Sequence, residues 1–442
     1  MKEILIGQDK MSIQDPPNSK TNKMWRPALV EDFPSLKKPQ LTALLDDGWF
    51  FDSPLNRPAV VIEKLGNAKL CIRGSLISAS ACQVWVACED PFLLVKAVGS
   101  ANLQLTISFF DKKAEHIKGR LIRVDVLQGL CLIELNVSSN KHYLSALGLH
   151  VLYHRIEVAP QAILDRGARL PSLEPYFEYQ TIKTRQEFDE VIDLRTKAYL
   201  EAGKLEDGSP MTDAFDEKAI ILVGKLFGKI VASLRIMPHR PGEAWEHDRF
   251  LTWTPELPPK PESVEITRVC TDPAFKRTNV LLGLFQRTAL LVLVCGRRYL
   301  IGCATQGLMP LYQRIGCIPS SVRFSHADLG NQQHTLFYAD VQESLLGKTM
   351  NPVTWSLLWN DTSLLSCDSG LLTTSSISDS LRQHVLRAGA PLLQTGGKIA
   401  LGLSRNLKKS QMRMSNKLLL NKSLVKPSLQ SSAMPRSAGF RI

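Results

Sequence analysis

Charged side chains recur at short spacings in the middle third of the 442-residue chain, within segments that are otherwise largely apolar. They form four pieces: Arg195-x-x-x-Tyr199, Asp213-x-x-Asp216, Ser233-Leu234-Arg235 and Glu265-x-x-Arg268. A carboxylate can accept a proton directly or through water, and a guanidinium group can orient a carboxylate. These residue types therefore indicate acid–base chemistry. The nine cysteines are scattered singly without a C-x-x-C pair, so no metal site is predicted.

The segments that carry these residues alternate between helix and strand. Apolar spacing predicts helices over 184–201, 279–296 and 309–315, and strands over 219–223, 229–236, 262–269, 298–304 and 334–341. This order resembles the N-acetyltransferase-like fold, an α+β fold with a mixed sheet flanked by helices. The resemblance implies that the sheet splays open beside residues 265–270 to hold a thioester.

Residues 184–345 resemble the long-chain N-acyl amino acid synthases, which are related to the acyl-homoserine lactone (autoinducer) synthases. Autoinducer synthases carry Arg-x-x-x-Phe, a pair of acids, Gly-x-x-Arg and Glu-x-x-Arg in the order of the four pieces above. The resemblance implies an N-acyltransferase. It would move a long-chain fatty acyl group from a thioester to the amine of an amino acid or similar small molecule.

The resemblance also implies roles for the central strand. Glu265 would act on the amine, as a base relay or as an ammonium anchor, and Arg268 would orient a carboxylate. The alternative is structural ion pairing, although residues i and i+3 of a strand face each other only across a bulge. The backbone N–H groups of Val269 and Cys270 would stabilise the tetrahedral oxyanion.

The remaining candidates have a functional and a structural interpretation each. Arg235 would orient a carboxylate or pair within the sheet. Asp213 and Asp216 would recognise the amine or remain solvated loop acids. Arg195 would fasten the first helix over the site or serve the fold alone. Tyr312 would be the acid for the leaving thiolate or a packed aromatic ring.

The start of the helix at 279–296 bears on the acyl donor. Family members that bind coenzyme A carry Gln/Arg-x-x-Gly-x-Gly/Ala there, because glycines let backbone N–H groups approach the pyrophosphate. Here Val280 and Leu281 stand near those glycine positions. This favours acyl-phosphopantetheine on an acyl carrier protein as co-substrate, with no bound cofactor. Lys276 and Arg277 would grip its phosphate or remain solvated. A coenzyme A-dependent N-acetyltransferase is the alternative.

Residues 55–157 contain closely spaced short strands, which predict a small antiparallel β-barrel. The stretches Gly74–Ser80, Gly119–Val124 and Gly129–Leu135 resemble a PilZ domain. The Arg-x-x-x-Arg and Asp/Asn-x-Ser-x-x-Gly signatures by which PilZ domains bind cyclic di-GMP are missing, so cyclic di-GMP is not expected as a ligand. A docking or scaffold role is predicted, and a non-catalytic regulatory protein remains a further alternative.

The flanking segments complete the predicted organisation: an arm over 1–54, a linker over 158–178, an acyltransferase domain over 179–345 and a basic, largely disordered tail over 346–442. The net charge of +12 lies mainly in the tail, because residues 365–442 hold 12 Lys/Arg and two acids. The rest is nearly neutral, so no nucleic-acid partner is expected. A cytoplasmic location is predicted, with contact between the tail and the inner membrane surface as an open alternative.

Overall fold

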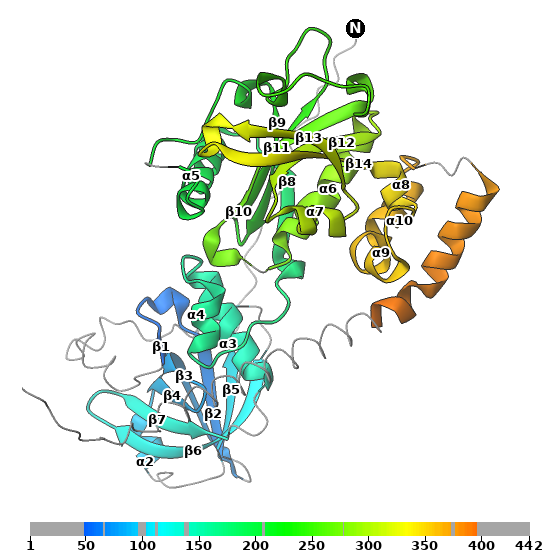
Figure 1. Cartoon of the computed structure of the whole chain (residues 1–442). Coiled ribbons are helices and arrows are strands. Elements are labelled where there is room, and N and C mark those ends of the chain that lie inside the picture. Colours follow the sequence, from blue (N-terminus) through cyan, green and yellow to red (C-terminus); the bar gives the residue numbers. More distant parts are fainter. Residues whose placement is uncertain are drawn as a thin grey trace, which may run out of the picture. The chain divides into compact units, whose positions relative to one another are not determined.

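The computed structural model describes residues 48–64, 67–95, 103–110, 114–136, 141–205, 208–276, 278–372 and 376–395. The chain forms two compact units, Met1–Ser172 and Leu173–Ile442. Figure 1 shows their elements, and each unit is described separately. No helix among the described residues is long and apolar enough to cross a membrane.

The first unit contains a closed antiparallel barrel. Its strands are β1 (Trp49–Phe50), β2 (Ala59–Lys64), β3 (Asn67–Ala79), β4 (Gln83–Cys88), β5 (Leu103–Ser108), β6 (Ala114–Asp125) and β7 (Leu130–Leu135). The sheet order β3-β2-β5-β6-β7-β4 closes because β4 also pairs with β3. Alternate residues of β5, namely Leu103, Leu105 and Ile107, are fully buried, as period-two patterning requires. The predicted barrel is confirmed, and its likeness to PilZ domains stays a prediction.

Three helices accompany the barrel: α2 (Pro91–Val95), α3 (Lys141–His154) and α4 (Pro160–Asp165). In α3, the Tyr143 hydroxyl donates to the Ser80 carbonyl oxygen at 3.0 Å, and His150 Nε2 lies 2.8 Å from the Asn56 carbonyl oxygen. These contacts tie α3 to the barrel. The prediction of a linker over 158–178 is wrong for the part that forms α4 and the beginning of the next strand.

The second unit is built on a seven-stranded mixed sheet. Its strands are β8 (Phe177–Thr181), β9 (Ile220–Leu226), β10 (Lys229–Pro238), β11 (Ser263–Thr271), β12 (Tyr299–Thr305), β13 (Ile318–His326) and β14 (Gln332–Asp340). Their order is β13-β14-β12-β11-β10-β9-β8. Only β11 and β12 run parallel among these pairs. With flanking helices, this is the predicted N-acetyltransferase-like α+β architecture.

Two long helices cover opposite faces of this sheet. Helix α5 (Arg185–Glu201) begins at a capping box on Thr184 and packs on Ile221 and Val223 of β9. Gly224, the next residue of β9, faces Val280 of helix α6 (Val280–Val294). Successive strand residues point to opposite faces, so the two helices lie on different sides of the sheet. The short helix α7 (Met309–Arg314) follows β12.

Strand β11 separates from β12 partway along its length. Of its nine residues, only Ser263–Glu265 are in register with Tyr299–Ile301 of β12. On its other side, the register with β10 shifts between Ser233 and Arg235, so β11 carries an extra residue there. Arg268 lies in this bulge with φ of 54°. A bulge bends its strand, and the predicted opening of the sheet is therefore present beside residues 266–270.

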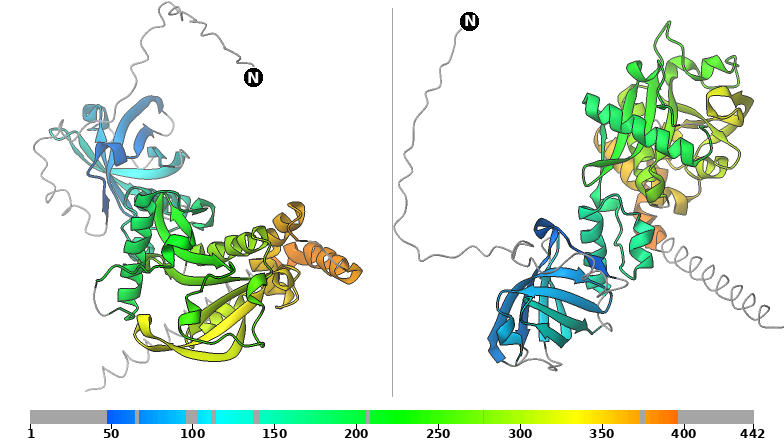
Figure 2. Two further views of the ribbon diagram at one scale, coloured as in Figure 1. Left: turned by 90° about the horizontal axis from the view of Figure 1, so that it is seen from above. Right: turned by 90° about the vertical axis from the view of Figure 1, so that its left-hand side faces the viewer.

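Helix α8 (Val341–Leu345) ends the predicted acyltransferase domain. Further helices lie where a disordered tail was predicted, namely α9 (Pro352–Leu358), α10 (Asn360–Asp368) and residues 377–395. Trp355 and Trp359 are buried, and their indole N–H groups donate to the carbonyl oxygens of Leu345 and Ile315. Figure 2 shows these helices beside the second sheet. The prediction is thus wrong for most of 346–395. Residues 1–47 and 396–442 lie outside the described part.

Candidate active site

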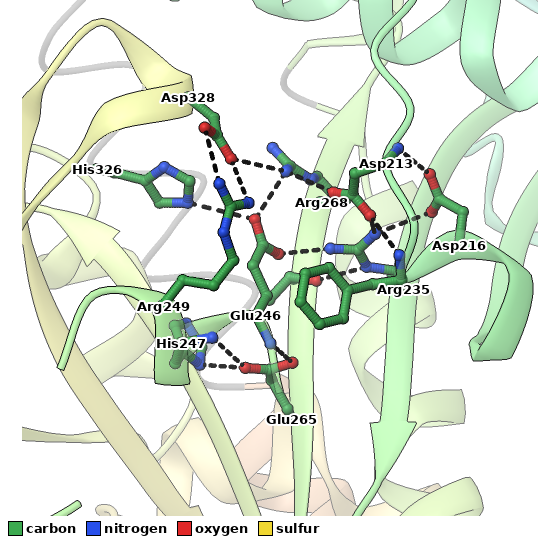
Figure 3. Close-up of polar contacts among 12 residues, drawn as sticks. Asp213, Asp216, Arg235, Glu246, His247, Arg249, Glu265, Arg268, His326 and Asp328 are labelled. Atoms are coloured by element: carbon green, nitrogen blue, oxygen red, sulfur yellow. Dashed lines mark hydrogen bonds and ion pairs between the residues drawn. The ribbon is translucent and has the colours of Figure 1, made fainter. Parts of the chain in front are cut away.

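A buried ion-pair network connects the first helix with the centre of the second sheet (Figure 3). Arg235 of β10 is fully buried and bonds the carboxylates of Asp213, Asp216 and Glu246. Asp216 also accepts from Arg195 of α5 at 2.8 Å. A buried guanidinium is tolerated only when such partners compensate for its lost hydration. Arg195 and Arg235 therefore have the structural contacts that the sequence left as an alternative.

Arg268 extends this network to the opening in the sheet. Its Nη2 lies 2.7 Å from both Asp213 and Glu246. Burial alone would raise the pKa of Asp213, but hydrogen bonds and charge from Arg235 and Arg268 outweigh it and lower that pKa. The pKa of Glu246 is likewise lowered despite burial, by His326, Arg268 and Arg235. Both carboxylates therefore stay ionised at neutral pH.

Glu265 lies apart from Arg268 and does not line the opening. Its carboxylate accepts the backbone N–H groups of Glu246 and His247, at 3.1 and 2.9 Å, and lies 2.7 Å from His247 Nδ1. Burial alone would lower the pKa of His247, but Glu265 raises it well above its ordinary value. This location does not favour the direct action on the amine that the sequence predicted for Glu265. Glu265 instead fixes the turn that presents Glu246.

A cleft of about 530 Å³ occupies the gap between β11 and β12. Its walls include Thr267, Arg268 and Val269 from β11 and residues 303–305 from β12. Of the predicted site residues, Arg268, Val269 and Tyr312 line it, whereas Arg195, Asp213, Asp216, Arg235, Glu265 and Cys270 lie outside its lining. Cys270 is in register with Ser233, whose hydroxyl lies 3.3 Å from its thiol.

Four further polar residues in the cleft wall were not predicted: Lys204, Glu246, His326 and His334. They come from the end of α5, the loop before η6 (His247–Arg249), β13 and β14. His326 Nε2 lies 3.4 Å from Glu246. None of the four belongs to the charged pieces singled out in the sequence, so they were not predicted. Among the described residues, no cluster of His, Cys, Asp or Glu could hold a metal ion.

The surroundings of Tyr312 bear on both of its predicted roles, the packed aromatic ring and the acid. Its ring stacks on Phe337 with centroids 4.3 Å apart and meets Phe285 edge-on at 5.7 Å. Burial raises its pKa, so the hydroxyl keeps its proton at neutral pH and can donate a hydrogen bond. Lys276, by contrast, is exposed and pairs with Glu201 at 2.6 Å. Arg277 lies outside the described residues.

An apolar cavity shares the wall residue Ile266 with the cleft. Its other walls are mostly apolar: Phe285, Ala289, Leu300, Ile315, Cys317, Ala339, Val341, Ser344 and Trp359. The cavity thus lies between α6, the sheet and the helices that follow the sheet. A polar cleft beside an apolar cavity suits a molecule with a reactive head and a hydrocarbon chain.

Comparisons with solved structures found several with similar folds. FeeM, an N-acyl amino acid synthase from uncultured soil microbes, is 13% identical over 39% of this chain and 95% of its own, with a TM-score of 0.31. TofI, in a ternary complex with an inhibitor and MTA, is 16% identical over 40% of this chain and 98% of its own, at 0.31. A putative N-acetyltransferase from Lactobacillus plantarum is 12% identical over 37% of this chain and 98% of its own, with a TM-score of 0.30.

The comparison with protein families is more specific. No curated protein matched the chain. The family model described as N-acyl amino acid synthase FeeM matches residues 190–340. This range runs from within α5 to the end of β14 and so contains the ion-pair network and the cleft between β11 and β12. Residues 190–340 of this chain are thus similar to the N-acyl amino acid synthases that this model describes, and the domain that they form is an acyltransferase.

Proposed function

We propose that this domain moves a long-chain fatty acyl group from an acyl carrier protein thioester to the amine of an amino acid or similar small molecule. The observation that carries the proposal is the polar cleft between β11 and β12, which meets an apolar cavity at Ile266. The thioester would lie in the cleft with its hydrocarbon chain in the cavity. Each buried CH₂ group contributes roughly 0.8 kcal/mol, which favours long chains.

The cleft supplies the groups that acyl transfer requires. Nitrogen attack turns the thioester carbonyl into an oxyanion, which backbone N–H groups in the bulge at Arg268 and Val269 would stabilise. Collapse of this adduct breaks the C–S bond. The Tyr312 hydroxyl, which lines the cleft and stays protonated because burial raises its pKa, would donate a hydrogen bond to the departing thiolate.

Lys204 supports an acceptor that carries a carboxylate. Its ammonium group lines the cleft and lies 5.6 Å from the centre of the Tyr199 ring. No carboxylate among the described residues pairs with it, whereas Arg235 and Arg268 each pair with Asp213 and Glu246. Burial lowers the pKa of Lys204. A substrate carboxylate would counter that effect, so an amino acid fits this cleft better than a simple amine.

The start of α6 supports a carrier protein as donor. Val280 is buried and packs toward Gly224 of β9, so side chains occupy the turn where glycines would expose N–H groups to a pyrophosphate. Phosphopantetheine on a carrier protein needs no such site. We propose a docking or scaffold role for the PilZ-like barrel and contact of the basic C-terminal segment with an anionic membrane surface.

Turnover with defined thioesters tests the proposed function. The purified full-length protein would be incubated with palmitoyl-carrier protein or palmitoyl-coenzyme A and a mixture of amino acids, and the products identified by mass spectrometry. We expect N-acyl amino acids from the carrier thioester. Absence of product with every long-chain carrier thioester would refute the proposal. Tight binding of acetyl-coenzyme A in calorimetry would favour the acetyltransferase alternative.

A further inference from the structure

Acyl transfer to an amine requires a group that takes a proton from the nitrogen, and neither nearby carboxylate suits this task. Glu265 does not line the cleft and is occupied by His247 and two backbone N–H groups. Glu246 lines the cleft, but its carboxylate is held by Arg235 and Arg268. A carboxylate paired with two guanidinium groups is a weak proton acceptor.

His334 of β14 has the geometry that these carboxylates lack. Its side chain lines the cleft, and its Nδ1 lies 2.8 Å from the carbonyl oxygen of Gln332. A carbonyl oxygen can only accept, so Nδ1 carries the proton of the neutral ring and Nε2 carries the lone pair. Among the described residues, none forms a hydrogen bond with Nε2. The hydrogen bond to Gln332 thus fixes the tautomer with the proton on Nδ1, and Nε2 is available to a ligand.

On the basis of the acyl transfer proposed above, we propose that Nε2 of His334 accepts the proton that the acceptor nitrogen loses during its addition to the thioester. The N–C bond forms, the carbonyl π electrons move to oxygen, and the proton passes from nitrogen to Nε2. When the adduct collapses, the C–S bond breaks and the thiolate leaves with a hydrogen bond from the Tyr312 hydroxyl. Solvent then carries the proton from His334 to the thiolate, so amine and thioester give amide and thiol.

The surroundings keep this ring ready to accept. Burial first, and then the charges of His326, Lys204 and His247, lower the pKa of His334 to about 4 despite the bond to Gln332. The other ionisable groups of the cleft are Tyr199, Glu246, Arg268, Cys303 and Tyr312. The ring is therefore neutral throughout the neutral pH range. Bond formation to the carbonyl makes the nitrogen far more acidic than a free ammonium group, so a weak base suffices for that step.

The test is a substitution that keeps the donor to Gln332 and removes the acceptor. In His334→Asn, we expect kcat to fall on the order of 10²- to 10³-fold, the usual contribution of general base catalysis, with an unchanged KM for the acyl carrier thioester. The deficit should shrink as pH rises, because hydroxide replaces the base. The control is Gln333→Ala, an exposed neighbour on the same strand, which should keep the wild-type kcat and pH profile.

The outcomes separate this inference from the proposed function. If wild type transfers acyl groups and His334→Asn keeps its kcat and pH profile, His334 is not the acceptor. If wild type acylates no amine, the proposed function fails and this inference falls with it. A variant that does not fold is recognised by thermal unfolding. In that case the pH dependence of kcat is measured for the wild-type protein with an amine that stays neutral down to pH 5. We expect kcat to fall only toward pH 4. A loss of kcat centred above pH 6 would contradict the inference.

Discussion

At the scale of single residues, Arg235 organises the site. Its guanidinium is fully buried and bonds three carboxylates from three segments of the chain. The sequence identified Arg235, Arg268, Asp213 and Asp216 as members of one constellation, because all stand in recurring charged pieces. Glu246 was missed, because it lies in the loop before β11, outside the four charged pieces, and only the fold brings it to Arg235.

Replacement of Arg235 tests this organising role. In Arg235→Met, the buried carboxylates lose their shared cation, and breaking a buried pair typically costs about 3–5 kcal/mol. We expect a loss of that size in the free energy of unfolding, measured by urea titration. The control is Arg185→Met, because Arg185 is exposed and its ion pair with Asp189 spans one helical turn at the surface. Equal stability of the Arg235 variant and the control would contradict the account.

Replacement of Lys204 tests the choice of acceptor. In Lys204→Met, we expect kcat/KM for amino acids to fall roughly 10- to 100-fold, as for loss of a hydrogen bond to a charged group. Matching amines without a carboxylate should be unaffected. Steady-state kinetics with phenylalanine and phenethylamine would measure both, with Lys183→Met, an exposed lysine before α5, as the control. An equal loss of kcat/KM for both acceptors would show that Lys204 does not bind the substrate carboxylate.

At the scale of elements, the sequence predicted those with strong periodicity. Helices α5 and α6 lie within two residues of their predicted bounds, because both have regular apolar faces. Strand β13 was missed, because Ile318–His326 is mostly polar and exposed at this edge of the sheet. Strand β8 follows a Pro- and Gly-containing stretch and was taken for linker. The bulge at Arg268 has no glycine to indicate it, so only the structure reveals it.

Helix α6 should set the length of the acyl chain. Ala289 is buried and lines the apolar cavity, so Ala289→Leu fills space that hydrocarbon would occupy. At roughly 0.8 kcal/mol per CH₂ group, losing room for two groups costs more than tenfold in kcat/KM for the longest chains. Short chains should be unaffected. Competition among carrier thioesters of graded length measures the shift, with exposed Val294→Leu as control. If the preference for acyl-chain length stays unchanged in Ala289→Leu, the hydrocarbon chain does not bind in this cavity.

The contacts between β10, β11 and the Asp213 segment should make stability depend on pH. Because the pKa values of Asp213 and Glu246 are lowered in the folded state, their stabilisation is present above the unfolded values near 4 and is lost as pH falls. The urea midpoint should therefore drop from pH 6 toward pH 3. The drop should be smaller in Arg235→Met, and an equal drop in both proteins would contradict the pairing.

At the scale of the whole molecule, helix 377–395 presents an unusual surface. Its inner face is bonded to the rest of the second unit: Gln383 donates to the Leu345 carbonyl oxygen, and Arg382 donates to that of Gly347. Large apolar residues of its other face are 62–90% exposed: Ile377, Leu381, Val385 and Leu392. Residues 396–442 follow with ten Lys/Arg and no acid. An exposed apolar stripe beside basic residues is typical of contact with anionic lipid.

Vesicle sedimentation tests this contact. The full-length protein should pellet with vesicles containing phosphatidylglycerol more than with neutral phosphatidylcholine vesicles. The double substitution Leu381→Ser and Leu392→Ser should weaken pelleting several-fold, since it removes apolar surface from the stripe. Ser380→Ala, at an exposed position of the same helix, should have no effect. If pelleting depends neither on lipid charge nor on Leu381 and Leu392, this surface does not contact lipid and is left as a contact for a protein partner.

The central claim is that an acyl thioester lies where β11 separates from β12. A crystal structure with an unreactive acyl-phosphopantetheine thioether tests it most directly. The account predicts the sulfur and carbonyl beside Arg268 and Val269, with the hydrocarbon chain passing Ile266 toward Ala289. Strands β11 and β12 paired through Val269 and Thr305, with the ligand bound elsewhere, would contradict it.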